Sequence, residues 1–259
     1  MSSSKIKTSA TSTDAFLGGR LNIVQPRQGH RAGSDAVFLA AAVPVETKAR
    51  VLDAGAGVGV AGLCLLARIP SVTITAVEID AALCRLAEAN AARNGCAESF
   101  KTVNADVTWP AKKLGAAGLL REGYDQVMAN PPFHEEGAVR AAPDRRKATA
   151  HVMQAGDLAV WIRFLASMTA PKGRVTLIYP AEHLGALLRQ LEGRFGDVKI
   201  FPLFPRATVP ATRIILQGRK GSRAAPKLLP GLVLHDSDGR YTDAAEAVLR
   251  EGEALRLQA

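Results

Sequence analysis

Cysteines and long apolar runs are both scarce in this chain of 259 residues. The three cysteines, Cys64, Cys84 and Cys96, are too few and too unevenly spaced for a disulfide framework, and none forms the close pair typical of zinc sites. No apolar run reaches the roughly 18 residues of a membrane helix, and residues 1–13 lack the apolar centre of a secretory signal. We therefore expect a cytoplasmic protein with no metal site and no membrane span.

Acidic residues are too few to balance the basic ones. The chain has 33 Lys and Arg against 24 Asp and Glu, a formal net charge of +9. Such an excess attracts polyanions, so nucleic acid is a natural partner, although any single cation can simply solvate a helix surface. The basic residues cluster at Arg20, Arg27, His30 and Arg31, at Arg140, Arg145, Arg146 and Lys147, and at Arg219, Lys220, Arg223 and Lys227.

Short apolar runs alternate with helical patterns along most of the chain, which predicts a doubly wound α/β fold with a mainly parallel sheet and helices on both faces. The last two expected strands are joined only by a Pro-rich connection, so we expect them to pair antiparallel at one edge. The expected strands are 50–54, 72–78, 100–104, 124–129, 174–179, 198–201 and 212–217, and the expected helices are 60–68, one beginning after Asp80, 157–169, 181–191 and 243–257.

A glycine-rich loop, Asp53-Ala54-Gly55-Ala56-Gly57-Val58-Gly59, lies directly after an expected strand and directly before an expected helix. In doubly wound folds ligands bind beyond the carboxyl ends of the strands. Glycines there allow tight turns and a close approach of the backbone to a ligand. Nicotinamide and flavin enzymes use similar loops, and a purely structural turn also fits this pattern.

Acidic residues follow the next two expected strands. Glu78 lies about twenty residues beyond the glycines, where a carboxylate can accept hydrogen bonds from both hydroxyls of a ribose. Asp80 is better suited to capping the next helix. Asp106 follows the third strand, where it could accept a hydrogen bond from an adenine amino group or occupy a solvated turn.

The loop after the fourth strand reads Asn130-Pro131-Pro132-Phe133. Two prolines stiffen the backbone and remove two N–H donors, so acceptors remain. The Asn130 side-chain oxygen and the Pro131 carbonyl can hold the two hydrogens of an –NH₂ group, and Phe133 offers a face on which a base can stack. A structural Pro-Pro turn is the alternative.

These acceptors suit methylation of a planar amine. Its lone pair is delocalised, and acceptors aligned on its hydrogens favour the tetrahedral geometry in which the nitrogen can attack a sulfonium methyl in line. Positioning and electrostatics then supply most of the rate acceleration, so no residue with a strongly shifted pKa is required.

Together these four loops resemble the sequential motifs of class I S-adenosylmethionine-dependent amino-methyltransferases, over roughly residues 50–217. The segments 29–37 and 206–213 are similar to the bacterial tRNA(Val) adenine-37 N6-methyltransferase family in particular. The resemblance implies a Rossmann-like fold with a seven-stranded, mostly parallel sheet and an antiparallel edge hairpin. The expected organisation is a flexible tail at 1–13, a methyltransferase domain at 14–218 with an N-terminal segment covering the site, and a basic extension at 219–259.

The same resemblance assigns site residues and partners. Asn130, Pro131 and Phe133 would hold the target amine, and the segment from Arg31 to Asp35 would lie across the methionine end of the cofactor. The expected partner is RNA, most plausibly tRNA, bound through basic residues that include Arg27, Arg31, Arg140, Arg145, Arg146 and Lys147. The expected S-adenosylmethionine-binding residues are Asp53, Gly55, Ala56, Gly57, Gly59, Glu78, Ile79, Asp106, Asn130, Arg31, Gly33 and Asp35.

Three acceptors remain compatible with the motifs. Adenine N6 in tRNA is favoured, and guanine N2 in rRNA is an alternative because His134 follows Phe133, as in many guanine-N2 enzymes. Those enzymes carry a second domain for which this chain is too short. Protein glutamine is the third acceptor, although those enzymes usually have Tyr in place of Phe133. A fold that merely binds cofactor or RNA would require the Asn130 loop to be vestigial.

Overall fold

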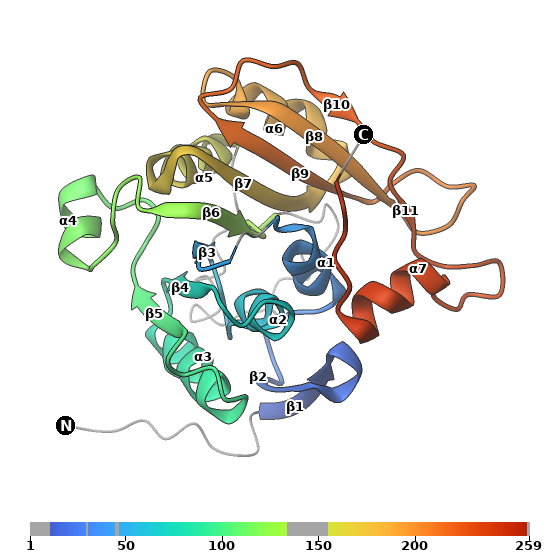
Figure 1. Cartoon of the computed structure of the whole chain (residues 1–259), viewed down its shortest axis with the longest axis horizontal. Coiled ribbons are helices and arrows are strands. Elements are labelled where there is room, and N and C mark those ends of the chain that lie inside the picture. The colour runs from blue at the N-terminus through green and yellow to red at the C-terminus, as the bar shows by residue number, and fades with distance from the viewer. Residues whose placement is uncertain (1–10, 30, 45–46, 134–154, 258–259) are drawn as a thin grey trace, which may run out of the picture.

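The computed structural model describes residues 11–29, 31–44, 47–133 and 155–257 (Figure 1). A twisted sheet runs through the molecule with strand order β10-β8-β9-β7-β6-β3-β4-β5, and β11 also pairs with β8. The strands of this sheet are β3 (Arg50–Ala54), β4 (Thr73–Glu78), β5 (Phe100–Asn104), β6 (Tyr124–Ala129), β7 (Thr169–Pro180), β8 (Phe195–Phe204), β9 (Arg213–Lys220), β10 (Lys227–Leu228) and β11 (Leu232–Val233).

Helices cover both faces of the sheet, as the alternation of patterns predicts (Figure 1). Successive strand residues point to opposite faces. In β3, Val51 belongs to one buried cluster with α1, α2 and α3, and the next residue, Leu52, belongs to a second cluster with α4, α5 and α6. The helices are α1 (Ser34–Ala42), α2 (Val60–Arg68), α3 (Ala81–Arg93), α4 (Ala111–Ala116), α5 (Ala155–Met168), α6 (Leu184–Leu191) and α7 (Asp243–Glu246).

The expected strands and helices of the core are confirmed, several with the expected bounds. β3 and α2 begin and end where the sequence predicts. Asp80 caps α3 as expected, because its Oδ1 accepts hydrogen bonds from the backbone N–H of Ala82 at 2.7 Å and of Leu83 at 3.4 Å. Strands β8 and β9 pair antiparallel, as the Pro-rich connection indicates.

The C-terminal extension corrects two expectations. The β8–β9 hairpin is not the edge of the sheet, because β10 and β11 from the extension pair with β8 in parallel. The helix expected over 243–257 is also shorter: a π turn (Ala247–Glu251) follows α7, and Gly252, with φ 69°, ends it. Beyond it the chain packs on α1, where the Leu255 backbone N–H donates to the Ala41 carbonyl at 2.9 Å.

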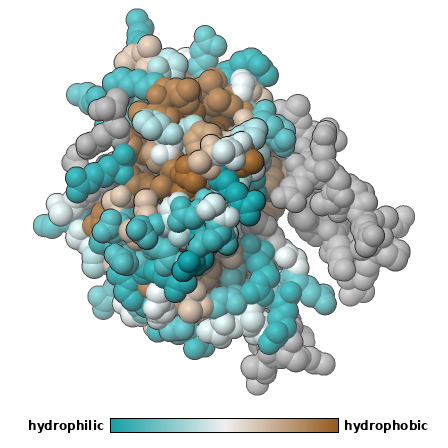
Figure 2. Space-filling view, turned by 90° about the vertical axis from the view of Figure 1, so that its right-hand side faces the viewer, coloured by the Kyte–Doolittle hydropathy of each residue, from teal (hydrophilic) through white to brown (hydrophobic). Residues whose placement is uncertain are grey.

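The short edge strands leave apolar surface uncovered. Figure 2 shows a hydrophobic patch in the upper half of this face and a hydrophilic lower half. The upper half corresponds to the region of β10 and β11 in Figure 1, where the Leu228 side chain is 72% exposed.

An N-terminal hairpin, β1 (Thr11–Phe16) with β2 (Leu21–Pro26), was not predicted. It packs on α3, where the buried amide of Asn90 bonds to both the N–H and the C=O of Val24, at 2.9 and 3.0 Å. The same side chain donates to the Val58 carbonyl at 3.1 Å, so one residue ties the hairpin to the glycine-rich loop.

The expected domain boundaries remain proposals. The boundary at residue 13 falls within β1, and the one at 218 falls within β9. None of the helices in the described part of the chain is long and apolar enough to cross a membrane.

Candidate active site

The sequence motifs converge at one edge of the sheet. Strands β3, β4, β5 and β6 are parallel neighbours, so the loops that follow them lie at their common carboxyl edge. The fold therefore brings the glycine-rich loop, the two acidic loops and the Asn130 loop together.

Three glycines with positive φ shape the first loop: Gly55 at 71°, Gly57 at 56° and Gly59 at 87°. A Cβ on Gly55 would lie 2.8 Å from the Trp161 ring, and one on Gly59 would lie 2.9 Å from the Phe100 ring, so both glycines are required for packing. A Cβ on Gly57 would meet nothing within 4 Å. Gly57 is therefore the point at which this loop can approach a ligand.

Glu78 is the central acceptor of the second loop. Its side chain is 9% exposed, and its two oxygens accept hydrogen bonds from the backbone N–H groups of Gly57 and Asp80, each at 2.9 Å. A carboxylate has about four lone-pair positions, so acceptor capacity remains for ribose hydroxyls. The adjacent Ile79 is 50% exposed and offers an apolar surface beside this acceptor.

Asn104, which the sequence analysis missed, organises the neighbouring loop. Its amide donates to the carbonyls of Glu78 and Ile79 at 2.9 and 2.8 Å, so β5 holds the loop after β4 in place. Asp106 uses Oδ1 to accept from the Thr108 N–H at 2.8 Å, which shapes the turn. Its contact with an adenine amino group stays a prediction.

Asp53 lies beneath the glycine-rich loop and is 2% exposed. Its Oδ2 accepts from the Gly62 N–H in α2 at 3.1 Å, which joins the end of β3 to that helix. Burial raises the pKa of Asp53 to about 7, against the opposing hydrogen bond from Gly62 and with a further contribution from the negative charge of Glu78.

This raised pKa predicts a pH-dependent stability. An unfolded Asp titrates near 3.8, so between pH 3.8 and about 7 the folded chain retains a proton that the unfolded chain loses. Stability is therefore lost as pH rises through this window, by about 1.4 kcal/mol per pH unit from this group. We expect urea unfolding to show Asp53→Asn gaining stability relative to the unmodified chain from pH 4 to 7. Parallel curves for the two proteins would contradict this.

Asn130 follows β6, and its side-chain oxygen has an unusual environment. The Oδ1 atom is buried and accepts no hydrogen bond from any described residue. Buried polar atoms nearly always have partners, and exceptions often mark functional positions. Pro131 is buried and Pro132 is exposed, so the first proline anchors the loop.

The Phe133 ring has an aromatic and a cationic neighbour. The Tyr179 ring meets it edge-on, with centroids 6.0 Å apart and an interplanar angle of 80°. The Arg213 guanidinium carbon lies 4.8 Å from the Phe133 centroid, and Arg213 Nε donates to Asp35 Oδ2 at 3.0 Å. Arg213 therefore links the substrate loop to α1, a role that the sequence analysis did not assign; its position in the family-like segment 206–213 was the available signal.

Some residues of the N-terminal segment that were expected to contact the cofactor make contacts within the protein instead. Arg31 pairs with Asp14 at 2.6 Å and also donates to Ser12 Oγ and the Pro26 carbonyl, so its charge is engaged by the hairpin. Gly33 precedes α1 as its N-terminal flanking residue. Cofactor contacts from Arg31, Gly33 and Asp35 stay predictions.

Several residues expected to bind RNA or to orient substrate lie outside the described ranges. Arg27 is described: its Nε donates to the Thr11 carbonyl at 2.9 Å, and it is exposed. The residues beyond the described ranges are His30, His134, Arg140, Arg145, Arg146 and Lys147.

Comparison with known proteins agrees with this geometry. Residues 31–170, more than half of the chain, match the methyltransferase small domain family. The tRNA1(Val) (adenine(37)-N6)-methyltransferase of Dickeya chrysanthemi is 27% identical over 252 residues, covering 94% of this chain and 96% of the relative. The protein of the same name from Porphyromonas gingivalis is 26% identical over 89% of this chain and 91% of the relative.

Solved structures show the same fold. The crystal structure of a predicted O-methyltransferase from Agrobacterium tumefaciens is similar with a TM-score of 0.73 and 26% identity, covering 86% of this chain and 98% of that one. A methyltransferase from Pyrococcus furiosus has a TM-score of 0.55 and 17% identity, covering 78% of this chain and 90% of that one. The expected Rossmann-like methyltransferase fold is confirmed.

Proposed function

The chain belongs to the methyltransferase small domain family, and from this premise we propose that it methylates the N6 amine of an adenine in tRNA. It is an S-adenosylmethionine-dependent methyltransferase. The observation that carries the proposed acceptor is the buried Oδ1 of Asn130, in the stiff loop after β6, which accepts no hydrogen bond from the described residues. An amino group of the substrate would supply the donor that this atom lacks among the described residues.

The residues of the carboxyl edge fit the cofactor. Gly57 leaves open space above the loop, Glu78 supplies a carboxylate for the ribose, and the exposed Ile79 side chain can pack on the adenine ring. When bound, S-adenosylmethionine supplies a methyl group on a sulfonium sulfur that keeps the bonding electron pair. Asp53 acts from beneath, because it holds β3 against α2 and so fixes the loop.

Gly57→Ala is expected to separate cofactor binding from stability. A positive φ costs alanine about 1 kcal/mol or slightly more relative to glycine. Gly193→Ala is the matched control. Gly193 has φ 72°, and a Cβ added there would meet nothing within 4 Å, but this residue lies in the turn after α6. We expect similar losses of unfolding free energy in both variants and at least about tenfold weaker S-adenosylmethionine binding by calorimetry in Gly57→Ala alone. Equal affinities would remove Gly57 from the cofactor site.

In the proposed mechanism the Asn130 loop holds the amine. Asn130 Oδ1 and the Pro131 carbonyl accept its two hydrogens and direct the nitrogen lone pair toward the methyl group, while Phe133 stacks on the base. As the N–C bond forms, the nitrogen becomes acidic and loses one proton to solvent. The side chains therefore act by orientation and by stabilising the developing positive charge.

The acceptor pair favours an amine over a hydroxyl. A hydroxyl has one hydrogen and gains most from a base, whereas two fixed acceptors match the two hydrogens of –NH₂. The names of the relatives from Dickeya and Porphyromonas support adenine in tRNA. The net charge of +9 suits an RNA partner, and we propose that Arg27, Arg31 and the cluster at Arg140, Arg145, Arg146 and Lys147 contact it. This activity would take place in the cytoplasm.

Nucleoside analysis tests the proposed acceptor. The purified chain is incubated with methyl-labelled S-adenosylmethionine and total tRNA from a strain that lacks the endogenous modification, and the RNA is then digested to nucleosides. We expect the label in N6-methyladenosine. Label in N2-methylguanosine, in a ribose-methylated nucleoside or only in protein would overturn the proposal in favour of that acceptor.

A further inference from the structure

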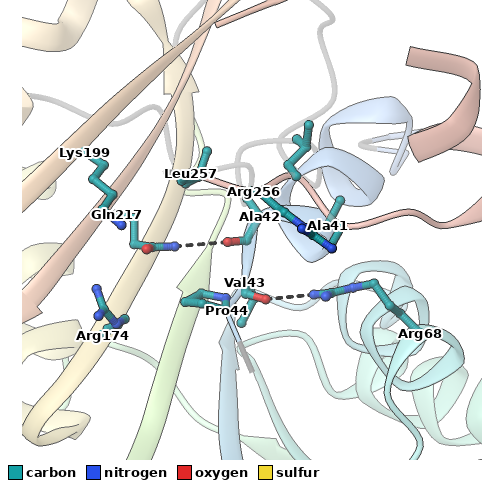
Figure 3. A pocket seen from close by; sticks show the side chains of 12 residues that line it. Ala41, Ala42, Val43, Pro44, Arg68, Arg174, Lys199, Gln217, Arg256 and Leu257 are labelled. Carbon is teal, nitrogen blue, oxygen red and sulfur yellow. Dashed lines mark hydrogen bonds between the residues drawn. The ribbon is translucent and has the colours of Figure 1, made fainter. Parts of the chain in front are cut away.

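A hollow lies toward the amino ends of the parallel strands, away from the motif loops at their carboxyl ends, and Figure 3 shows it from close by. Its volume is about 250 Å³, and its walls come from the end of α1, the end of α2, the strands β7, β8 and β9, and the C-terminal segment 254–257. Arg174 in β7 pairs with Gln126 near the start of β6, whereas the Asn130 loop follows the end of that strand. Four strand residues, each rising about 3.3 Å, therefore separate Arg174 from the Asn130 loop, a distance of roughly 13 Å.

Positive charge dominates this hollow. Arg174 and Lys199 lie on one side of it, and Arg68 and Arg256 lie on the other (Figure 3). The described residues that line it include no Asp or Glu. Asp197, outside the lining, forms an ion pair with Arg174 Nη1 at 3.9 Å, a distance too long for a hydrogen bond.

Two buried donors at this hollow lack partners. Arg68 Nε and Arg174 Nη1 are buried, and neither donates a hydrogen bond to a described residue. Burial lowers the pKa of the Arg68 guanidinium, a sign that its charge is incompletely compensated. Buried charged donors without an acceptor are costly, so such a pair calls for an anion.

The donors are also held in position. Arg68 Nη2 donates to the Ala40 and Val43 carbonyls, each at 2.8 Å, and Gln217 Nε2 donates to the Ala42 carbonyl at 3.0 Å. Figure 3 shows the bonds to Val43 and Ala42. These bonds use the carbonyls at the end of α1 and fix the guanidinium plane. The rest of the guanidinium, including the Nε–H that has no described partner, is therefore held in a fixed orientation, as a preorganised anion site requires.

We propose that this hollow binds a phosphate group. Guanidinium N–H groups match phosphate oxygens in geometry, and hydrogen bonds between charged partners are short and strong. The volume is about eight times that of a water molecule in the liquid, which is room for a phosphate and part of its hydration. The phosphate can be a free ion or part of an RNA backbone.

A neighbouring hollow could take the next phosphate of an RNA backbone. It has a volume of about 470 Å³, shares Arg174 with the first, and is also lined by Lys48, Lys172 and Arg219, with Asp125 as its acidic residue. Successive phosphates could occupy the two hollows. This surface includes none of the motif residues, so phosphate binding can be measured without methyl transfer and is tested separately from the proposed function.

Thermal unfolding of the full chain in sodium phosphate and in sodium chloride of equal ionic strength tests the site. At about five times the dissociation constant, phosphate is expected to raise Tm by about 2–4 °C. Phosphate also stabilises proteins non-specifically. The test therefore compares the Tm difference between the two salts in variants of the hollow with that difference in a control variant. Lys199→Gln and Arg174→Gln should each lose most of the difference between the two salts, whatever their own Tm. Arg206→Gln, which removes an exposed charge outside both hollows, should keep it.

Binding of an unmodified tRNA transcript then identifies the source of the phosphate. If the phosphate belongs to RNA, Lys199→Gln reduces the slope of log affinity against log salt by about one, and Arg206→Gln leaves it unchanged. If the site takes a free ion, the slope is the same in both variants while the Tm difference is still lost in Lys199→Gln. Equal Tm in the two salts for the unmodified chain, or a phosphate effect that survives both pocket substitutions, would overturn the proposal.

Discussion

Asn130→Ala is expected to lower kcat by about 100- to 1,000-fold while leaving the protein folded and able to bind S-adenosylmethionine. The magnitude is that of removing one preorganised hydrogen-bonding group that acts on the reacting atoms. Stability should change little, because Oδ1 has no hydrogen bond to a described residue that the substitution could break. A loss of turnover without a loss of stability is characteristic of a group placed for substrate.

The matched control for this variant is on the same strand. Gln126, near the amino end of β6, has a buried amide oxygen that likewise accepts no hydrogen bond from the described residues. Gln126→Ala should therefore keep kcat within about threefold, because its oxygen lies at the edge opposite the motif loops. Steady-state methyl transfer at saturating tRNA measures kcat for both variants, so that a change in tRNA affinity does not enter. A kcat for Asn130→Ala that matches the control would remove Asn130 from the mechanism.

Glu78→Gln is expected to weaken S-adenosylmethionine binding by about 10- to 100-fold. Two N–H groups, from Gly57 and Asp80, point at the two carboxylate oxygens, so an amide –NH₂ in either position faces a donor. The variant also loses the charge that strengthens the proposed bonds to the ribose, each worth about 1.5–3 kcal/mol. Isothermal calorimetry with the folded variant gives the affinity directly.

Glu98→Gln serves as the control for charge. It removes one negative charge from an exposed position before β5 and should leave the cofactor affinity unchanged. An undiminished affinity in Glu78→Gln would place the ribose elsewhere. A loss in both variants would show that the effect comes from the overall charge.

The core of the fold could be predicted because its signals are local. Local patterns predict β3, α2 and the start of α3 to within a few residues. These patterns are short apolar runs, buried on both faces of the sheet, that are followed by glycines or capping residues. The candidate site follows from the same signals, since parallel strands bring their carboxyl-terminal loops to one edge. Proline stiffening of the Asn130 loop could also be read directly from its sequence.

The parts that were missed depend on contacts between distant residues. Strand β1 carries few apolar residues and pairs with β2, which the amides of Asn90 and Asn94, more than 60 positions away, hold against α3. Arg213 reaches Phe133 and Asp35 only because β9 inserts between β7 and β8. Neither contact leaves a periodic pattern in the sequence.

The helix predicted in the C-terminal extension was wrong for a related reason. An apolar pattern over 243–257 predicts a helix, yet Gly252 in a left-handed conformation ends it, and the chain continues along α1 with Leu257 buried. Burial of Leu257 against the core outweighs the local helical preference. The same packing places Arg256 beside Arg68 and builds the basic hollow.

Asn130 is proposed to hold the amine that is methylated. The most direct measurement is a crystal structure of the chain with S-adenosylhomocysteine and an unmodified RNA carrying the target adenine. We expect Asn130 Oδ1 to lie about 2.7–3.2 Å from the adenine N6 nitrogen, with the base stacked on Phe133. An amine bound away from the Asn130 loop, with Oδ1 occupied by a donor of the protein itself, would contradict it.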